Sequence, residues 1–221
     1  MSLSETLENM KEIQTNLLEF LEDEEEIDEN FHRLEIVFDN QKIQNNKYGL
    51  ISLFHLITRI ANNYHRTSTL YSKIDRILRY FINSIKIHFS NTEIFNIFKS
   101  NKRILLFLIE EKIIMIDEYF IKTITSGKYL KANYPRYFMP EIKQFKILKS
   151  QQNETLPENF YTNRKIGENE NYICKLIRED AIEEFITYVN KTNFSLKSEI
   201  IMSIYETNSY LIKNTISSIF N

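Results

Sequence analysis

Glycine and proline are both scarce, with three of each in a chain of 221 residues. Tight β-turns, strained active-site loops and phosphate-binding loops all depend on glycine. The scarcity therefore favours helices that are joined by short polar loops. It also leaves no glycine-rich loop, so the sequence contains neither a P-loop nor a dinucleotide-binding pattern.

Other features that mark a particular compartment or partner are missing as well. Cys174 is the only cysteine, so the chain cannot form an internal disulfide. The formal net charge is −2, so no overall field draws the chain toward nucleic acid or an acidic membrane. The N-terminus lacks a signal-peptide pattern, and apolar runs such as Ile104 to Ile109 are far shorter than the roughly 20 residues that cross a bilayer. We therefore expect a cytoplasmic protein without membrane insertion.

Apolar residues recur at intervals of three and four along most of the chain, which is the period of an amphipathic helix. The pattern predicts an all-α fold with about nine to eleven helices and essentially no sheet. Ser90 and Glu93 fit a capping box before one of them. Helices are expected over 4–23, around 27–38, over 46–63 and 69–89, after Ser90, over 101–111 and 114–125, after Pro140, and over 171–178, 181–190 and 203–213.

The polar stretch 151–170 is interpreted as a linker between an N-terminal helical domain, 1–150, and a C-terminal segment, 171–221. An internal echo connects these two parts, because ILLFLIEEKII at 104–114 resembles ICKLIREDAIE at 173–183. The spacing of 69 residues is close to two ankyrin periods of about 33 residues. The echo predicts similar helix pairs at 101–125 and 171–190.

Four longer stretches carry a resemblance to a family. They are SNTEIFNIFKSNKRILLFLIEEKII (90–114), NYPRYFMPEIKQF (133–145), KIGENENYICKLIREDAIEEFITYVN (165–190) and SIYETNSYLIK (203–213). They resemble the N-terminal region of protozoan ankyrin-repeat proteins, a helical domain of unknown function that leads into an ankyrin array. The resemblance implies stacked antiparallel helix pairs, α-solenoid-like, that end in degenerate ankyrin-like repeats at 171–221. The chain departs from the family in having no T-P-L-H-like repeat.

No arrangement of residues indicates catalysis, a cofactor or a metal ion, and the resemblance supplies no catalytic residue. Cys174 has no partner thiol at zinc spacing and no histidine close in sequence that would activate it. None of the histidines forms a metal-binding pair; they are His32, His55, His65 and His88. We therefore predict that the chain is not an enzyme and has no catalytic, cofactor or metal site.

The preferred interpretation is a non-enzymatic protein–protein interaction module or scaffold. The alternative is a nucleic-acid-binding helical protein that uses the segment 122–149, where cations alternate with aromatic residues that can stack on bases. Nucleic acid is the less favoured partner because the chain as a whole is not basic. Three residues of this segment are candidates for an interaction surface: Lys143, Lys146 and Lys149.

The C-terminal end is rich in apolar residues and lacks the polar cap that terminal repeats need. Exposed apolar surface usually marks an interface, so we expect self-association through this end. Its candidate surface residues are Tyr210, Leu211, Ile216 and Phe220.

Overall fold

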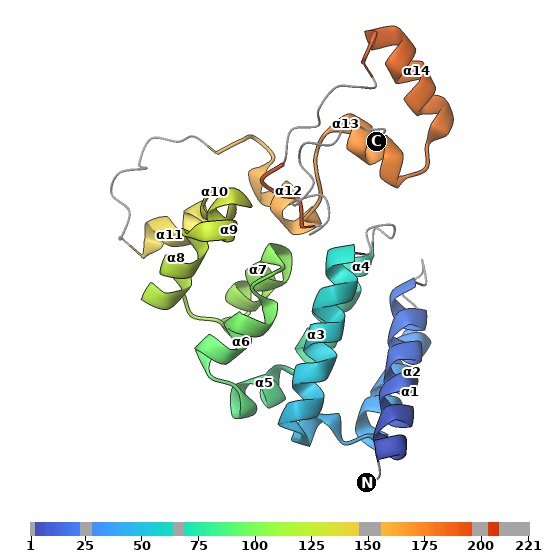
Figure 1. Cartoon of the computed structure of the whole chain (residues 1–221), viewed down its shortest axis with the longest axis vertical. Coiled ribbons are helices and arrows are strands. Elements are labelled where there is room, and N and C mark those ends of the chain that lie inside the picture. Colours follow the sequence, from blue (N-terminus) through green and yellow to red (C-terminus); the bar gives the residue numbers. More distant parts are fainter. Residues whose placement is uncertain (1–2, 23–27, 64–68, 146–155, 196–202, 208–221) are drawn as a thin grey trace.

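The computed structural model describes residues 3–22, 28–63, 69–145, 156–195 and 203–207. Within these ranges the protein is all-helical, with fourteen α-helices, one 3₁₀ helix and no strand (Figure 1). This confirms the predicted all-α fold class, although the helices outnumber the prediction. None of the described helices is long and apolar enough to span a membrane.

The helices follow one another through short connections. The first are α1 (Leu3–Glu22), α2 (Asp28–Asn40), η1 (Ile43–Asn45), α3 (Lys47–Asn63), α4 (Leu70–Tyr80), α5 (Ile82–His88), α6 (Asn91–Phe98) and α7 (Lys102–Glu110). The others are α8 (Glu118–Ile124), α9 (Gly127–Lys131), α10 (Tyr134–Tyr137), α11 (Met139–Gln144), α12 (Phe160–Ile166), α13 (Tyr172–Arg178) and α14 (Ile182–Thr192).

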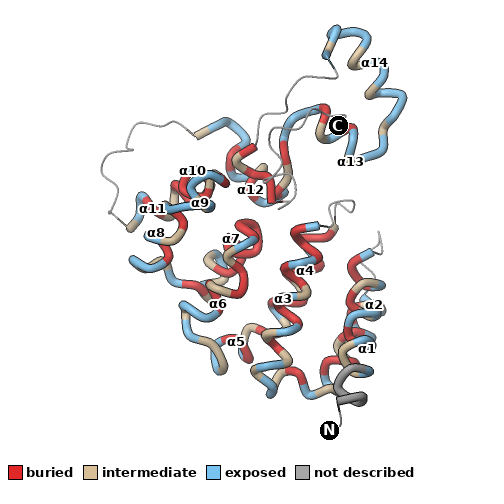
Figure 2. The backbone as a smooth tube through the Cα atoms, viewed as in Figure 1, coloured by how far each residue is buried: buried red, intermediate tan, exposed pale blue. Residues whose placement is uncertain are grey.

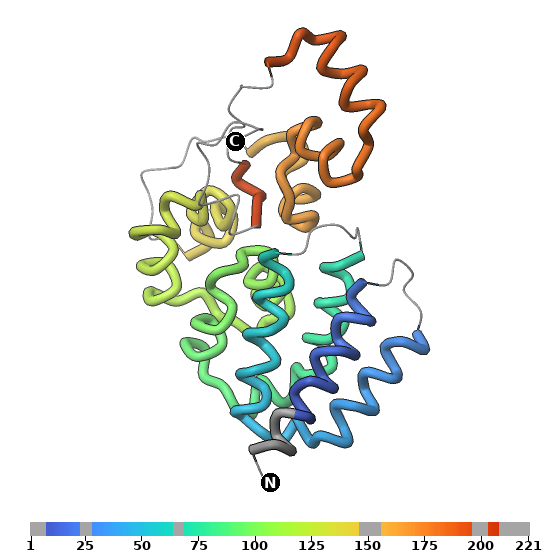
Figure 3. The backbone as a smooth tube through the Cα atoms, turned by 45° about the vertical axis from the view of Figure 1, so that its right-hand side comes forward, coloured from blue at the N-terminus to red at the C-terminus, as the bar shows by residue number. Residues whose placement is uncertain are grey.

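One continuous hydrophobic core runs from Ile13 of α1 to Phe160 of α12 and includes Tyr205 near the C-terminus. It is built by helix pairs that pack together, among them α1 with α2 and α4, α3 with α6, α4 with α7, and α7 with α12 (Figures 1 and 3). Phe54 lies at the centre of an aromatic cluster, with ring centroids 5.4 to 6.0 Å from those of Phe81, Phe89 and Phe98. Most of the apolar helix faces that the sequence predicts therefore pack into this core.

The predicted capping box at the start of α6 is present. The Ser90 hydroxyl accepts a hydrogen bond from the Glu93 backbone N–H at 3.3 Å, and the Glu93 carboxylate accepts one from the Ser90 N–H at 2.8 Å. Two otherwise unpaired backbone donors are thus satisfied. The start of this helix is fixed by its own sequence.

The additional helices arise at breaks that the apolar pattern does not reveal. The predicted helix over 69–89 is interrupted at Phe81, so α4 and α5 are separate. Three helices, α9 to α11, occupy the region where one helix was expected after Pro140. Pro135 and Pro140 each stand in the first turn of a helix, where the missing N–H leaves no bond unmade. Each proline therefore favours the start of a short helix.

Helix α12 lies inside 151–170, where the sequence predicted a linker. Its Phe160 belongs to the core, and its Arg164 is buried in an ion pair with Glu141 at 2.7 Å. Residues 203–207 are not helical, so the expected helix over 203–213 is wrong in its described part. The division into domains 1–150 and 171–221 stays a prediction.

The two helix pairs that the echo predicts are alike in their first helices only. Helices α7 and α13 are each capped by an asparagine, and each is followed, two residues after its end, by a residue with positive φ, Lys112 or Asp180. The next N–H then bonds to a carbonyl in the last turn, from Ile113 to Leu108 at 2.8 Å and from Ala181 to Leu176 at 3.0 Å. The second helices differ, because α8 buries three apolar side chains and α14 buries none.

Candidate functional site

The candidate surface residues from the sequence are only partly placed by the structure. Lys143 is exposed on α11. The others lie outside the described residues: Lys146, Lys149, Tyr210, Leu211, Ile216 and Phe220. Of the C-terminal end, 203–221, the structure describes only 203–207, where Tyr205 is buried. The expected self-association through the other residues of this end stays a prediction.

The aromatic residues of the basic segment point into the protein. Tyr134, Tyr137 and Phe138 are buried. The Tyr134 hydroxyl donates to the Lys99 carbonyl oxygen at 2.9 Å, and the Tyr137 hydroxyl donates to the Arg164 carbonyl oxygen at 2.8 Å. Base stacking needs an exposed ring face. Three aromatic rings of the segment 122–149 are therefore part of the core.

The cations of the same segment lie on the surface. Lys122 of α8, Lys128 and Lys131 of α9, and Lys143 of α11 are all exposed. Helix α9 has no buried residue, and its Leu130 side chain is 55% exposed. The segment thus presents positive charge and one large apolar side chain, while Tyr129 and Phe145 are half-buried.

The most distinctive surface is the apolar stripe of α14, formed by Ile182, Phe185, Ile186 and Val189. These residues follow the i, i+3, i+4, i+7 spacing of one helix face. None of them is buried, and Ile182 and Ile186 are 61% and 53% exposed. In Figure 2 the whole of α14 is exposed or intermediate, in contrast to the buried faces of α3 and α7. The amphipathic pattern of this helix is therefore not used for the core.

The hairpin of α13 and α14 has buried apolar side chains and a ring contact outside the stripe. Ile173 and Leu176 of α13 are buried, but neither belongs to the main hydrophobic core. The Tyr172 and Tyr188 rings meet edge to face with centroids 5.1 Å apart and join the two helices. The hairpin thus forms a small unit at one end of the molecule (Figure 1).

Polar contacts attach this hairpin to the preceding loop. The Arg178 guanidinium lies 2.8 Å from the Glu168 carboxylate and donates to the Asn169 carbonyl oxygen at 3.0 Å. Asn171 caps α13 by accepting a hydrogen bond from the Ile173 N–H at 3.0 Å. These contacts all involve side chains outside the stripe.

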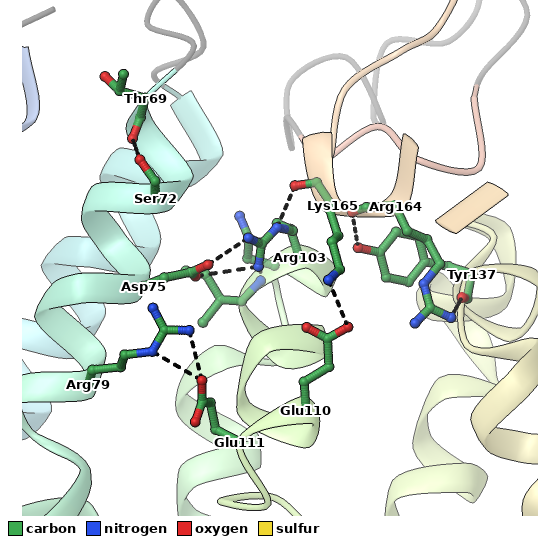
Figure 4. Close-up of polar contacts among 12 residues, drawn as sticks. Thr69, Ser72, Asp75, Arg79, Arg103, Glu110, Glu111, Tyr137, Arg164 and Lys165 are labelled. Carbon is green, nitrogen blue, oxygen red and sulfur yellow. Dashed lines mark hydrogen bonds and ion pairs between the residues drawn. The ribbon is translucent and has the colours of Figure 1, made fainter. Parts of the chain in front are cut away.

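A groove of about 1190 Å³ lies between α4, α12 and α13, with Asp75 and Arg103 among its lining residues. Figure 4 shows Asp75 of α4 and Arg103 of α7 pointing toward each other. Their ion pair is 2.7 Å long, and the Arg103 Nε also donates to the Lys165 carbonyl oxygen. Burial raises the pKa of Asp75, and the Arg103 guanidinium partly offsets this rise. The ion pair therefore links α7 to α4 in the lining of the groove.

The other cations that line the groove are also paired. Lys165 lies 3.8 Å from Glu110, Lys175 lies 3.8 Å from Glu179, and Arg178 is bound to Glu168. A general acid or base needs a titratable group that can reach a substrate in the right protonation state. Each cation that lines the groove is therefore paired with a carboxylate of the protein itself, which favours a structural role for these groups.

Cys174 is an unfavourable nucleophile in this setting. It is half-buried on α13, and burial raises the pKa of its thiol to about 11. The reactive thiolate is therefore scarce at neutral pH. In the part of the chain that the structure describes, no three His, Cys, Asp or Glu side chains gather where they could hold a metal ion.

Sequence reasoning missed the buried polar groups at the centre of the molecule. Lys102 of α7 is 1% exposed; its Nζ donates to the Ala132 carbonyl oxygen at 3.3 Å and lies 5.3 Å from the centre of the Tyr137 ring. Burial lowers its pKa to about 7, against the opposing effect of Glu206 and Glu170. No local pattern separates this lysine from exposed ones, because its surroundings come from residues far along the chain.

The fold and these surfaces define an all-helical protein with a buried polar centre and one helical hairpin that displays an apolar stripe. Comparison with protein-family models, with curated proteins and with solved structures found no match for the chain. The residues themselves therefore carry the functional argument.

Proposed function

We propose that the chain is a non-enzymatic protein–protein interaction module that binds its partner through the apolar stripe of α14. The observation that carries the proposal is the exposure of Ile182 and Ile186 on a helix whose apolar spacing is complete and which buries no residue. Amphipathic helices of this kind bind by laying such a stripe into an apolar groove of another protein. The ankyrin-type scaffold role that the sequence resemblance implies is compatible with this binding mode.

The energetics favour a partner for the stripe. Complete burial of an isoleucine side chain releases about 1.5–3 kcal/mol, so covering two half-exposed isoleucines contributes a useful part of a moderate affinity. Phe185 and Val189 are intermediate in burial and widen the contact. Glu183, Glu184 and Lys191 on or beside the other face remain exposed. The helix therefore separates an apolar binding face from a solvated one.

Nucleic-acid binding through 122–149 is the second candidate, and the exposed cations Lys122, Lys128 and Lys131 favour it. The buried rings at Tyr134, Tyr137 and Phe138 weaken it. We rank it second because a backbone-binding protein of this type relies on a strongly basic domain, and the chain has a net charge of −2.

The test compares proteins retained by the full chain with those retained by two double variants. Ile182→Asp with Ile186→Asp places two charges on the stripe. Thr187→Asp with Asn190→Asp places the same charges at exposed positions outside the stripe. Partners identified by crosslinking and mass spectrometry should be kept by the wild type and the control and lost by the stripe variant. Retention of the same partners by the stripe variant would show that α14 is not the binding face.

A further inference from the structure

We infer that the stripe of α14 binds a second copy of this chain, on the basic surface formed by Lys122, Lys128, Leu130 and Lys131. This inference rests on the proposed function, since it names the occupant of the same stripe. It assigns a head-to-tail contact in which α14 of one molecule lies on α8 and α9 of the next. Three observations support it: the charge beside the stripe, the charge and apolar content of the basic surface, and the separation of the two surfaces within one chain.

The N-terminal end of α14, where the stripe begins, carries four acids. Glu179, Asp180, Glu183 and Glu184 are all exposed at the turn into α14 and in its first turn. Among the described residues, no ion pair engages Asp180, Glu183 or Glu184, and Glu179 has one exposed contact with Lys175 at 3.8 Å. Acids suit the N-terminal end of a helix, but their number gives this end of α14 a negative field. The occupant of the stripe should therefore carry positive charge beside an apolar side chain.

The surface of α8 and α9 has this composition. Lys122, Lys128 and Lys131 are exposed, and within the described residues none of them forms an ion pair with a carboxylate. Leu130 stands among them with 55% of its surface exposed. Helix α9 packs against α8, so the three lysines and the leucine lie on two adjoining helices. Complementary charges of this kind direct the encounter and fix its register, while the apolar contact adds affinity.

The positions of the stripe and the basic surface favour a contact between two molecules over one within a single chain. Helix α14 and the α8–α9 pair lie far apart in both views of the backbone (Figures 1 and 3), so they cannot meet within one chain. A parallel contact of α14 with α14 would bring the same acids together, which is repulsive, and a two-fold antiparallel contact would place them beside Lys191, the one cation of the other α14. A contact of α14 with the basic surface has opposite charges facing each other. Such a contact is heterologous and extends into rings or short chains.

The experiment measures the mass of the full chain by light scattering and sedimentation equilibrium over a range of concentrations. At about 0.05 M salt the average mass should rise above the 26.6 kDa of the monomer with increasing concentration, and at about 1 M salt it should return to that value because charges are screened within about 3 Å. A monomer at every concentration and salt would overturn the inference.

Charge reversal then identifies the surfaces. Glu183→Lys with Glu184→Lys, and separately Lys128→Glu with Lys131→Glu, should each abolish self-association. Mixing the two variants should restore it, because opposite charges face each other again. The control, Glu8→Lys with Glu19→Lys on α1, changes the net charge at exposed positions away from both surfaces and should associate like the wild type. The lysine variant leaves α14 untouched, and circular dichroism checks the folding of each variant.

The outcomes separate this inference from the proposed function. Failure of the mixture to restore association, or association that ignores all four charge changes, overturns the head-to-tail contact. If the chain is monomeric while Ile182→Asp with Ile186→Asp still abolishes capture of another protein, the assigned partner is wrong and the interaction module stands. If neither self-association nor capture depends on the stripe, both proposals are wrong.

Discussion

Arg103 of α7 and Asp75 of α4 form a two-point ion pair, with guanidinium nitrogens 2.7 and 3.4 Å from the two carboxylate oxygens. Their side chains are 8% and 12% exposed. A second pair, Arg79 with Glu111, joins α4 to the end of α7 at 2.8 Å, but its side chains are 57% and 31% exposed (Figure 4). The two pairs connect the same elements, but the first is buried and its Arg103 also donates to the Lys165 carbonyl oxygen.

The buried pair should matter far more to stability than the exposed one. Arg103→Met leaves Asp75 buried without its cation, so the free energy of unfolding should fall by about 3–5 kcal/mol. Arg79→Met removes an exposed pair and should cost less than about 1 kcal/mol. Urea denaturation followed by circular dichroism measures both. Equal losses in the two variants would show that solvent reaches Asp75.

The glycines give a second matched pair. Gly167 has φ +75°, and a Cβ at this position would lie 3.2 Å from the Arg103 side chain and from Tyr71 Cε2. Gly127 has φ +52°, and a Cβ there would meet nothing within 4 Å. Gly127→Ala should therefore cost about 1 kcal/mol of backbone strain. Gly167→Ala adds a steric clash to the same strain and should lower Tm by clearly more.

Thermal denaturation of the two alanine variants tests this difference. The carbonyl oxygen of Gly167 accepts a hydrogen bond from the Thr207 hydroxyl at 2.8 Å, and that hydroxyl lies 2.7 Å from the Tyr71 hydroxyl. A shift of Gly167 thus also disturbs the attachment of 203–207 to α4. Equal changes in Tm would mean that the Arg103 side chain moves aside without cost.

The sequence predicts the helices whose ends or faces are encoded locally. Ser90 and Glu93 start α6 through their own side chains, and the spacing of Ile182 and Ile186 predicts α14. The break at Phe81 and the helix α12 were missed because tertiary contacts decide them. Arg164, for example, is buried and contacts the Glu141 carboxylate and the Tyr137 carbonyl oxygen. The polar sequence around Arg164 does not reveal that these distant residues will lie beside it.

The candidate site was predictable only in part for a related reason. A helix that faces the core and a helix that faces a partner have the same apolar period. The exposure of Ile182 and Ile186, and the burial of Tyr134 and Tyr137, depend on which helices lie beside them. The sequence therefore indicated aromatic stacking where the rings are buried, and it did not single out the stripe that is exposed.

Nucleic acid should bind weakly and without sequence preference. A mobility-shift assay with RNA and DNA at moderate salt should give an affinity that falls steeply as salt rises, because phosphate contacts dominate. Changing Lys143, Lys146 and Lys149 to Glu should weaken it further, because each change removes a cation that could contact phosphate. Submicromolar binding that this triple change removes would reverse the ranking of the two functions.

The last prediction concerns the pH dependence of stability. Burial lowers the pKa of Lys102 from 10.5 to about 7 in the folded protein, so between these values the unfolded chain binds more protons at this position. The contribution of Lys102 to the free energy of unfolding must then rise with pH from about 7 to about 10.5. Below pH 7 the folded state must hold a buried ammonium, which is unfavourable; above pH 10.5 the lysine is neutral in both states.

Lys102→Met replaces the buried lysine with an apolar side chain of similar length and removes this term. Relative to the wild type, the variant should be most stable near pH 6, by about 1–4 kcal/mol, and the advantage should shrink steadily toward pH 10. Other titrating groups cancel in this difference. Lys11→Met, at an exposed position on α1, should show a difference from wild type that does not change with pH. Urea denaturation at several pH values gives the comparison, and a constant difference for Lys102→Met would mean that solvent reaches the Lys102 ammonium in the folded protein.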